Sequence, residues 1–133
     1  MAQEAFEDLV ETFEFLDDWE DRYRHVIDMG KAMPAFDEAL KVPALKVDGC
    51  ASQVWLHTNT DGGVLQFTGD SDAMIVKGLI AVLITLYSGT SLADAREIDA
   101  QAELARLGLD DHLSSQRSNG LRAMVQRLRE TVA

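Results

Sequence analysis

The chain contains one cysteine and few histidines, which restricts the chemistry it can perform. Its 133 residues include a single cysteine, Cys50, and three histidines. One cysteine cannot close an internal disulfide, and this set cannot supply a Cys₄ or Cys₂His₂ zinc site. The sequence therefore predicts neither a disulfide scaffold nor a structural metal, and it leaves Cys50 as the one side chain with nucleophilic sulfur chemistry.

Basic residues are also scarce. The chain has 12 lysines and arginines against 23 aspartates and glutamates, which gives a formal net charge of −11. Because such an acidic excess repels phosphate backbones, we expect no nucleic-acid partner. The main basic cluster lies near the C-terminus, and we interpret it as the solvated face of a helix; it comprises Arg117, Arg122, Arg127 and Arg129.

Targeting and membrane-spanning signals are missing as well. Residues 1–8 lack the basic start and apolar run of a secretory signal, which favours a cytoplasmic, reducing environment. The apolar segment 73–87 is too short to cross a membrane, because about fifteen residues at roughly 1.5 Å each do not span a hydrocarbon layer of ~30 Å. No linker, low-complexity tract or repeat divides the sequence, so we predict a single domain over residues 1–133.

Apolar residues at helical spacing predict helices in the first third of the chain. One stripe lies within residues 6–16 and another within residues 17–30. For the second helix Asp17 is a candidate N-cap, and Glu20 lies three residues on, as a capping box requires. A further short helix or helical turn is expected over residues 35–41, which two prolines bracket.

Two more helices are predicted in the second half. Residues 73–87 are apolar almost all round, which is typical of a central, buried helix, and Asp70 and Asp72 are candidate caps for it. The last stripe lies within residues 121–132 and is preceded by two possible capping residues, Ser118 and Asn119.

The middle of the chain predicts a β-hairpin. Residues 53–58 and 64–68 alternate between polar and apolar side chains and flank a turn-rich connector. A third strand is expected over residues 45–48, which would place Cys50 at the bend between two strands. The predicted fold class is α+β, a small antiparallel sheet of about three strands with helices packed on one face.

Cys50 follows Gly49 at this predicted bend. One interpretation is a reactive thiol that a partner can reach. The other is a small hydrophobe packed in the core, since free cysteine is among the most buried residue types. Among the charged side chains, Asp48 would raise the pKa of the thiol if it lay close, whereas Lys46 or Arg117 would lower it, so position alone leaves both interpretations open.

Four segments of the chain resemble the SufE family of sulfur-acceptor proteins, the partners of pyridoxal-phosphate cysteine desulfurases. The first is residues 17–30, which begin with Asp17-Asp18-Trp19-Glu20-Asp21-Arg22-Tyr23-Arg24. The second is Gly49-Cys50 followed by Ser52-Gln53-Val54-Trp55, and the third is residues 69–79. A fourth, weaker segment spans residues 112–125 and includes Arg117-Ser118 and Gly120-Leu121. They appear in the family's order and cover nearly the whole chain.

The resemblance implies a covalent sulfur carrier. In that family the cysteine that matches Cys50 accepts sulfur from the persulfide of a desulfurase of the SufS or CsdA kind. The carrier stimulates that enzyme and relays the sulfur to a downstream iron–sulfur scaffold. Pyridoxal phosphate is then expected only in the partner, and the fold is similar to that of the scaffold protein IscU.

The resemblance also singles out Arg117, which matches the family's arginine ahead of the last helix. Together with Asn119, it suggests a polar contact with the cysteine loop or with the partner; a surface ion pair is the alternative. Two positions depart from the family pattern. Ala51 stands where many members have glutamine, and Ser115, where many have proline, is expected to loosen the turn before Arg117.

One thiol is sufficient for this chemistry, because persulfide transfer needs a single attacking thiolate on the acceptor. A protein that holds an iron–sulfur cluster needs several ligands. We therefore hypothesise that Cys50 carries sulfur, and that it is partly shielded at rest to limit oxidation by peroxide.

Two other functions stay open. A cysteine hydrolase or thiol peroxidase would pair Cys50 with His25 or His112 in a substrate pocket. A non-covalent regulator would bind the desulfurase without using the thiol. The carrier hypothesis predicts that the chain itself is not an enzyme.

Overall fold

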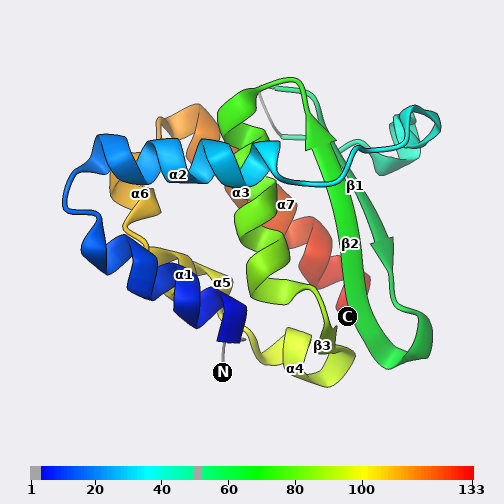
Figure 1. Cartoon of the computed structure of the whole chain (residues 1–133). Coiled ribbons are helices and arrows are strands. Elements are labelled where there is room, and N and C mark those ends of the chain that lie inside the picture. Colours follow the sequence, from blue (N-terminus) through cyan, green and yellow to red (C-terminus); the bar gives the residue numbers. More distant parts are fainter. Residues whose placement is uncertain (1–3, 50–51) are drawn as a thin grey trace.

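The computed structural model describes residues 4–49 and 52–133 and has the predicted α+β architecture (Figure 1). The sheet has three antiparallel strands in the order β1–β2–β3. They are β1 (Val54–Asn59), β2 (Val64–Ser71) and the short β3 (Thr90–Ser91). Figure 1 shows the β1–β2 hairpin along one side of the molecule, with the α-helices gathered on the other side.

The hairpin explains why helices cover only one face of the sheet. Leu56 on β1 pairs with Gly69 on β2, and both are buried. Their neighbours His57 and Thr68 also pair with each other, and both are exposed. Because successive residues of a strand point to opposite faces, one face lies against the core and the other faces solvent.

The predicted third strand over residues 45–48 is wrong. A 3₁₀ turn, Pro43–Leu45, occupies its start. Beyond the turn, Lys46 forms one isolated bridge with Trp55, and the Val47 N–H donates to the Val54 carbonyl at 2.8 Å. The proline has a fixed φ angle and favours the turn. Residues 46–48 therefore pair with β1 only through this bridge and this hydrogen bond, which do not make a strand. The third strand is instead β3, which pairs with the start of β2.

The central helix α3 (Met74–Tyr87) is buried as predicted and packs against β2 on one side and α2 (Trp19–Lys31) on the other. Where α2 and α3 cross, Gly30 of α2 lies against Gly78 of α3. A Cβ atom added to Gly30 would lie 2.6 Å from the backbone nitrogen of Gly78. The two backbones therefore touch because neither glycine carries a side chain.

The remaining elements surround this centre. The predicted helix within residues 6–16 is α1 (Glu4–Phe15), and the segment 35–41 contains only the 3₁₀ turn Glu38–Leu40. A third 3₁₀ turn, Asp61–Gly63, joins β1 to β2. The chain then continues through α4 (Leu92–Glu97), α5 (Ala100–Ala105), α6 (Leu109–His112) and α7 (Ser115–Val132). In the described part of the chain, no helix has both the length and the hydropathy that a membrane span requires.

The predicted caps of two helices are wrong. The N-cap of α2 is Asp18, whose carboxylate accepts from the Glu20 N–H at 3.0 Å, so Asp17 forms no capping box. Helix α7 begins earlier than expected and is capped by Ser114, whereas Ser118 lies buried inside it. In both cases the helix begins beside a residue that can accept from an unsatisfied N–H of the first turn.

Candidate functional site

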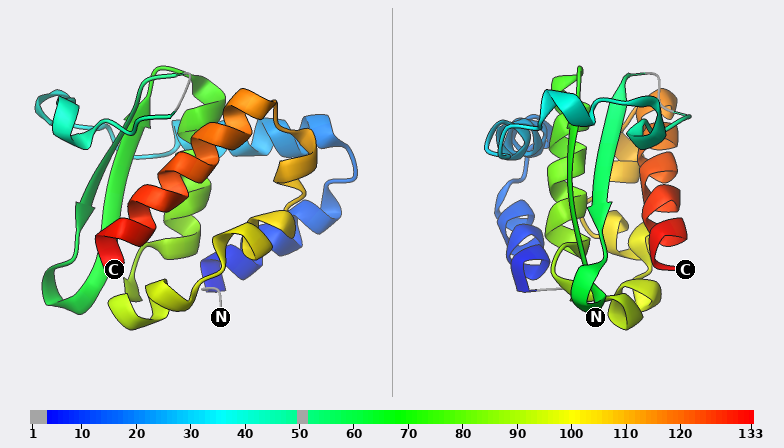
Figure 2. Two further views of the ribbon diagram at one scale, coloured as in Figure 1. Left: turned by 180° about the vertical axis from the view of Figure 1, so that it is seen from behind. Right: turned by 90° about the vertical axis from the view of Figure 1, so that its right-hand side faces the viewer.

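Cys50 and Ala51 lie outside the described residues, so the predictions about the thiol stay predictions. The described ends of this loop are Gly49 and Ser52. Gly49 has a φ of +91°, a conformation that favours glycine, and a Cβ atom there would lie 3.4 Å from the Cβ of Ala123 on α7. One described end of the loop therefore lies against the last helix, α7, which runs across the near side of the molecule in the rear view of Figure 2.

A cavity of about 350 Å³ lies beside the other end. Ser52, which one residue separates from Cys50, lines it together with the start of α3 and the first half of α7. Its apolar lining includes Leu79 and Met124, both fully buried. Its polar lining comprises Ser52, Ser114, Gln116 and Arg117. A small polar group near the loop would thus meet hydrogen-bond donors above an apolar floor.

Hydrogen bonds anchor the chain on both sides of the loop. Before it, the Val47 N–H donates to the Val54 carbonyl, and Arg127 Nη2 on α7 donates to the Lys46 carbonyl at 2.8 Å. After it, the Gln53 N–H donates to Asp72 Oδ1 at 3.0 Å. The span between these anchors is short, so its described ends have fixed positions beside α7 and the cavity.

Arg117 reaches the same cavity from the first turn of α7. Its backbone N–H donates to Ser114 Oγ at 3.3 Å, and its Nη1 donates to the Tyr23 hydroxyl at 2.6 Å. The guanidinium carbon lies 5.8 Å from the centre of the Tyr23 ring. The structure thus brings Arg117 and Ser52 to one cavity, while a role for Arg117 in chemistry stays a prediction.

Two residues near Arg117 differ from expectation. Asn119 does not line the cavity; its side-chain oxygen accepts from Arg122 Nη1 at 3.2 Å on an exposed part of α7. Ser115 is the first residue of α7, a position that favours proline because its N–H needs no helical partner. Since the Ser114 cap already holds this turn, the serine there does not leave Arg117 without support.

Tyr23 is the residue at this site that sequence reasoning missed. It lies 94 positions from Arg117 in the chain, so no local pattern connects the two. The available signal was weak: Tyr23 is one helical turn beyond Trp19, and the two rings meet edge to face at 6.4 Å. Helical spacing predicts that Trp19 and Tyr23 share one face of α2, but it does not predict what that face contacts.

The histidines do not lie at the cavity. The rings of His25 and Phe13 form a T-shaped pair with their centres 5.9 Å apart, and the His112 ring stacks on Trp19 with the centres 4.1 Å apart. His57 is exposed on the solvent face of β1. None of the described cavity-lining residues is a histidine, so the geometry lends no support to a Cys–His pair through these rings. The described residues also contain no cluster of three or more metal-ligating side chains.

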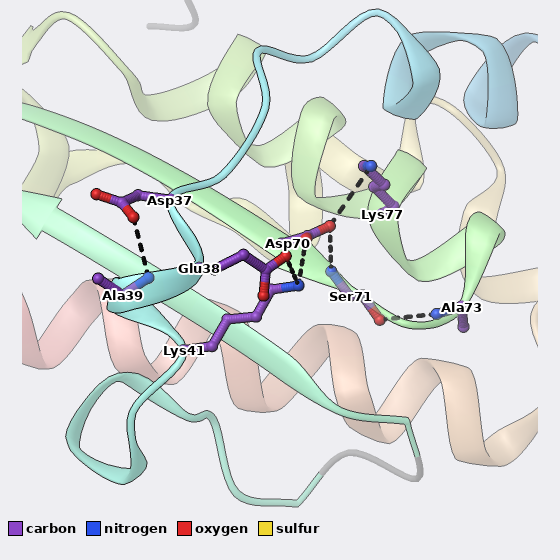
Figure 3. A network of polar contacts seen from close by, with 8 residues as sticks. All are labelled: Asp37, Glu38, Ala39, Lys41, Asp70, Ser71, Ala73 and Lys77. Carbon is purple, nitrogen blue, oxygen red and sulfur yellow. Dashed lines mark hydrogen bonds and ion pairs between the residues drawn. The ribbon is translucent and has the colours of Figure 1, made fainter.

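Asp70 and Asp72 do not cap α3, contrary to prediction; the N-cap is Ala73, with no side-chain cap. Asp72 instead binds Gln53, and Asp70 forms ion pairs with Lys41 at 3.2 Å and Lys77 at 3.5 Å (Figure 3). Partial burial raises the pKa of Asp70. The Ser71 N–H and the two lysines outweigh this effect and hold the pKa below its ordinary value of 3.8.

The Asp70 cluster ties three parts of the chain together. Lys41 belongs to the connector that precedes the cysteine loop, and it also binds Glu38 at 2.9 Å. Lys77 belongs to the first turn of α3. Asp70 therefore fixes the connector and α3 to the end of β2, beside the segment that anchors the loop.

Comparison with known proteins identifies the same architecture and sequence pattern elsewhere. The SufE family model, described as an Fe-S metabolism associated domain, matches residues 7–132. An uncharacterized SufE-like protein of Rhizobium etli is 50% identical over 130 residues, which cover 95% of this chain and 88% of the relative. The sulfur acceptor protein CsdE of Escherichia coli is 44% identical over 122 residues, which cover 89% of this chain and 81% of that protein.

A solved structure has the same fold. The solution structure of a hypothetical protein from Thermus thermophilus has a TM-score of 0.80 and covers 99% of this chain and 96% of its own. Its sequence is only 21% identical, so the likeness concerns the fold alone.

Proposed function

Because this chain belongs to the SufE family, we propose that it accepts sulfur on Cys50 from a cysteine desulfurase and relays it toward iron–sulfur cluster assembly. The observation that carries the proposal is the family match over residues 7–132 in a chain whose single cysteine is Cys50. The relative from Escherichia coli, which is named a sulfur acceptor protein, supports the same role.

The proposed reaction is thiol exchange. The Cys50 thiol loses its proton to solvent, and the thiolate attacks the outer sulfur of the desulfurase persulfide. A sulfur–sulfur bond forms on Cys50 as the sulfur–sulfur bond of the desulfurase breaks. The desulfurase cysteine leaves as a thiolate and takes up a proton. No external oxidant or reductant is needed, because the outer sulfur moves between two thiols.

The described surroundings of the loop are consistent with this exchange. The cavity beside Ser52 offers polar side chains for a charged sulfur group, and its apolar lining includes Leu79 and Met124. The anchors at Val47 and Gln53 hold the ends of the loop, so a partner would need to act only on the short span between them.

We further propose that the chain is a carrier and activator and not itself an enzyme. Pyridoxal phosphate belongs to the desulfurase, where it supplies the chemistry that releases sulfur from free cysteine. This role requires a reduced thiol, which a cytoplasmic setting would provide.

The test is the mass of the intact protein. The chain is incubated with a desulfurase of the SufS or CsdA kind and free cysteine, and we expect one sulfur atom to be added at Cys50 and to be removed by a reductant. Cys50→Ser is the matched control and should gain no sulfur. If Cys50→Ser stimulates the desulfurase as strongly as the unaltered chain does, the protein is a non-covalent regulator and the carrier proposal is wrong.

A further inference from the structure

Arg117 is held at the cavity by a neutral partner. Its Nη1 donates to the Tyr23 hydroxyl at 2.6 Å, and its guanidinium carbon lies 5.8 Å from the centre of that ring. At the other end of the side chain, the Ser114 cap fixes the backbone of Arg117. Among residues 4–49 and 52–133, Arg117 takes part in no ion pair. These contacts fix its position and leave its charge uncompensated.

Four other cations among the described residues are neutralised by carboxylates. Arg106 donates to Glu7 at 2.6 Å and to Glu103 at 3.0 Å. Lys41 lies between Glu38 and Asp70. In a chain with a net charge of −11, an arginine bound to a phenol can still pair with an incoming anion, since a guanidinium has five N–H donors and the Tyr23 contact uses one.

Tyr23 is itself held by rings on neighbouring elements. It lies half-buried on α2, one turn beyond Trp19, whose ring it meets edge to face at 6.4 Å. The Trp19 ring stacks on His112 of α6 at 4.1 Å. Helix α2 in turn packs against α3 along the close glycine crossing. The phenol oxygen thus has a defined place from which to orient the arginine.

On the basis of the proposed function, we infer that Tyr23 is a positioning residue for sulfur transfer, which holds the Arg117 guanidinium at the cavity for an anionic sulfur group. The attacking thiolate and the persulfide it becomes both carry negative charge. A cation already in position stabilises that charge without the cost of reorganising a flexible side chain during the reaction. Nothing in the local sequence around Tyr23 assigns it this role.

The experiment compares the two tyrosines of the chain. The rate at which Cys50 gains sulfur is measured in a single turnover, by quenching and intact mass, with pre-loaded desulfurase in excess. The variants are Tyr23→Phe, Arg117→Gln, the double variant, and Tyr87→Phe as a control. Tyr87 is buried on α3 and does not bind Arg117. Melting temperatures of all variants are recorded beside the rates.

We expect Tyr23→Phe to slow transfer by about 3- to 10-fold, the factor that corresponds to the loss of one net hydrogen bond. Arg117→Gln should slow it further, and adding Tyr23→Phe to Arg117→Gln should change nothing more, because the phenol acts only through the arginine. Tyr87→Phe should transfer sulfur at the unaltered rate.

Two results would overturn the inference. One is an equal rate for Tyr23→Phe and Tyr87→Phe. The other is a slowing by Tyr23→Phe that is as large in the Arg117→Gln background as in the unaltered chain, which would indicate a general structural effect. Failure of the unaltered chain to gain any sulfur is a different result: it defeats the proposed function, and the inference with it.

Discussion

The contact between α2 and α3 predicts that Gly78→Ala destabilises the protein. A Cβ atom at Gly78 would collide with the carbonyl oxygen of Val26, and it would lie 2.7 Å from both the carbonyl carbon and Cγ1 of that residue. Two of these three atoms belong to the backbone and cannot rotate away. The helices must therefore separate, and the buried Val26 and its neighbours lose packing.

Two opposing effects set the magnitude. Alanine is favoured over glycine inside a helix by about 1 kcal/mol. Overpacking of a filled core costs about 1–3 kcal/mol and occasionally more. Because the collision involves backbone, we place its cost at the upper end and expect a net loss of about 2 kcal/mol in the free energy of unfolding. For a chain of this size that corresponds to a fall in melting temperature of roughly 6–10 °C.

The assay is urea unfolding followed by circular dichroism, together with a thermal melt. Gly63→Ala is the control: its φ is +76° and no atom lies within 4 Å of the added Cβ, so it should lose only the roughly 1 kcal/mol of a left-handed alanine. If Gly78→Ala melts at or above the temperature of the unaltered protein, helix propensity has prevailed and the steric argument is refuted.

Three further predictions concern buried or paired polar groups. The hydrogen bond from Arg106 is the main reason why the pKa of Glu7 is lowered, so Glu7→Gln should cost a little stability near neutral pH. The difference from the unaltered chain should shrink as the pH falls below 4.5 and vanish once the carboxyl of the folded protein is protonated. Asp70→Asn should likewise lower the melting temperature above pH 3.8, and this loss should disappear on further acidification in a pH series of thermal melts. Burial raises the pKa of Asp70, but the Ser71 N–H, Lys41 and Lys77 outweigh it. Burial raises the pKa of Tyr87, and its hydroxyl has no hydrogen-bond partner in the described part of the chain; Tyr87→Phe should therefore be neutral or stabilise by up to about 1 kcal/mol in urea unfolding, and a clear loss would contradict this.

The helices and the hairpin could be predicted because their signals are local. The apolar run at 73–87 has no polar face to place in water, so it had to become the buried helix α3. The alternation in β1 and β2 likewise required one covered face and one open face. Helix boundaries were less certain, since several neighbouring side chains can cap the same turn. Thus Asp18 replaced Asp17, and Ser114 replaced Ser118.

The third strand shows where local reasoning fails. Residues 45–48 resemble a strand in sequence, but pairing depends on what the chain does before and after, and Pro43 begins a turn there. The strand Thr90–Ser91 is too short to be predicted from its own residues. It pairs with β2 because α3 ends beside that edge of the sheet. Strand pairing is a long-range choice, and its free energy lies in contacts between distant segments.

The amino-acid sequence by itself determined that the chain has a single thiol, that it has a buried helix and a hairpin, and that it resembles sulfur acceptors. These follow from residue type and spacing, which are properties of neighbours along the chain. Only the tertiary structure decided that Tyr23 binds Arg117, that Asp70 joins a connector to α3, and that Ser52 and α7 share a cavity. Such contacts form between residues far apart in sequence, so they depend on how the helices and the sheet pack against one another.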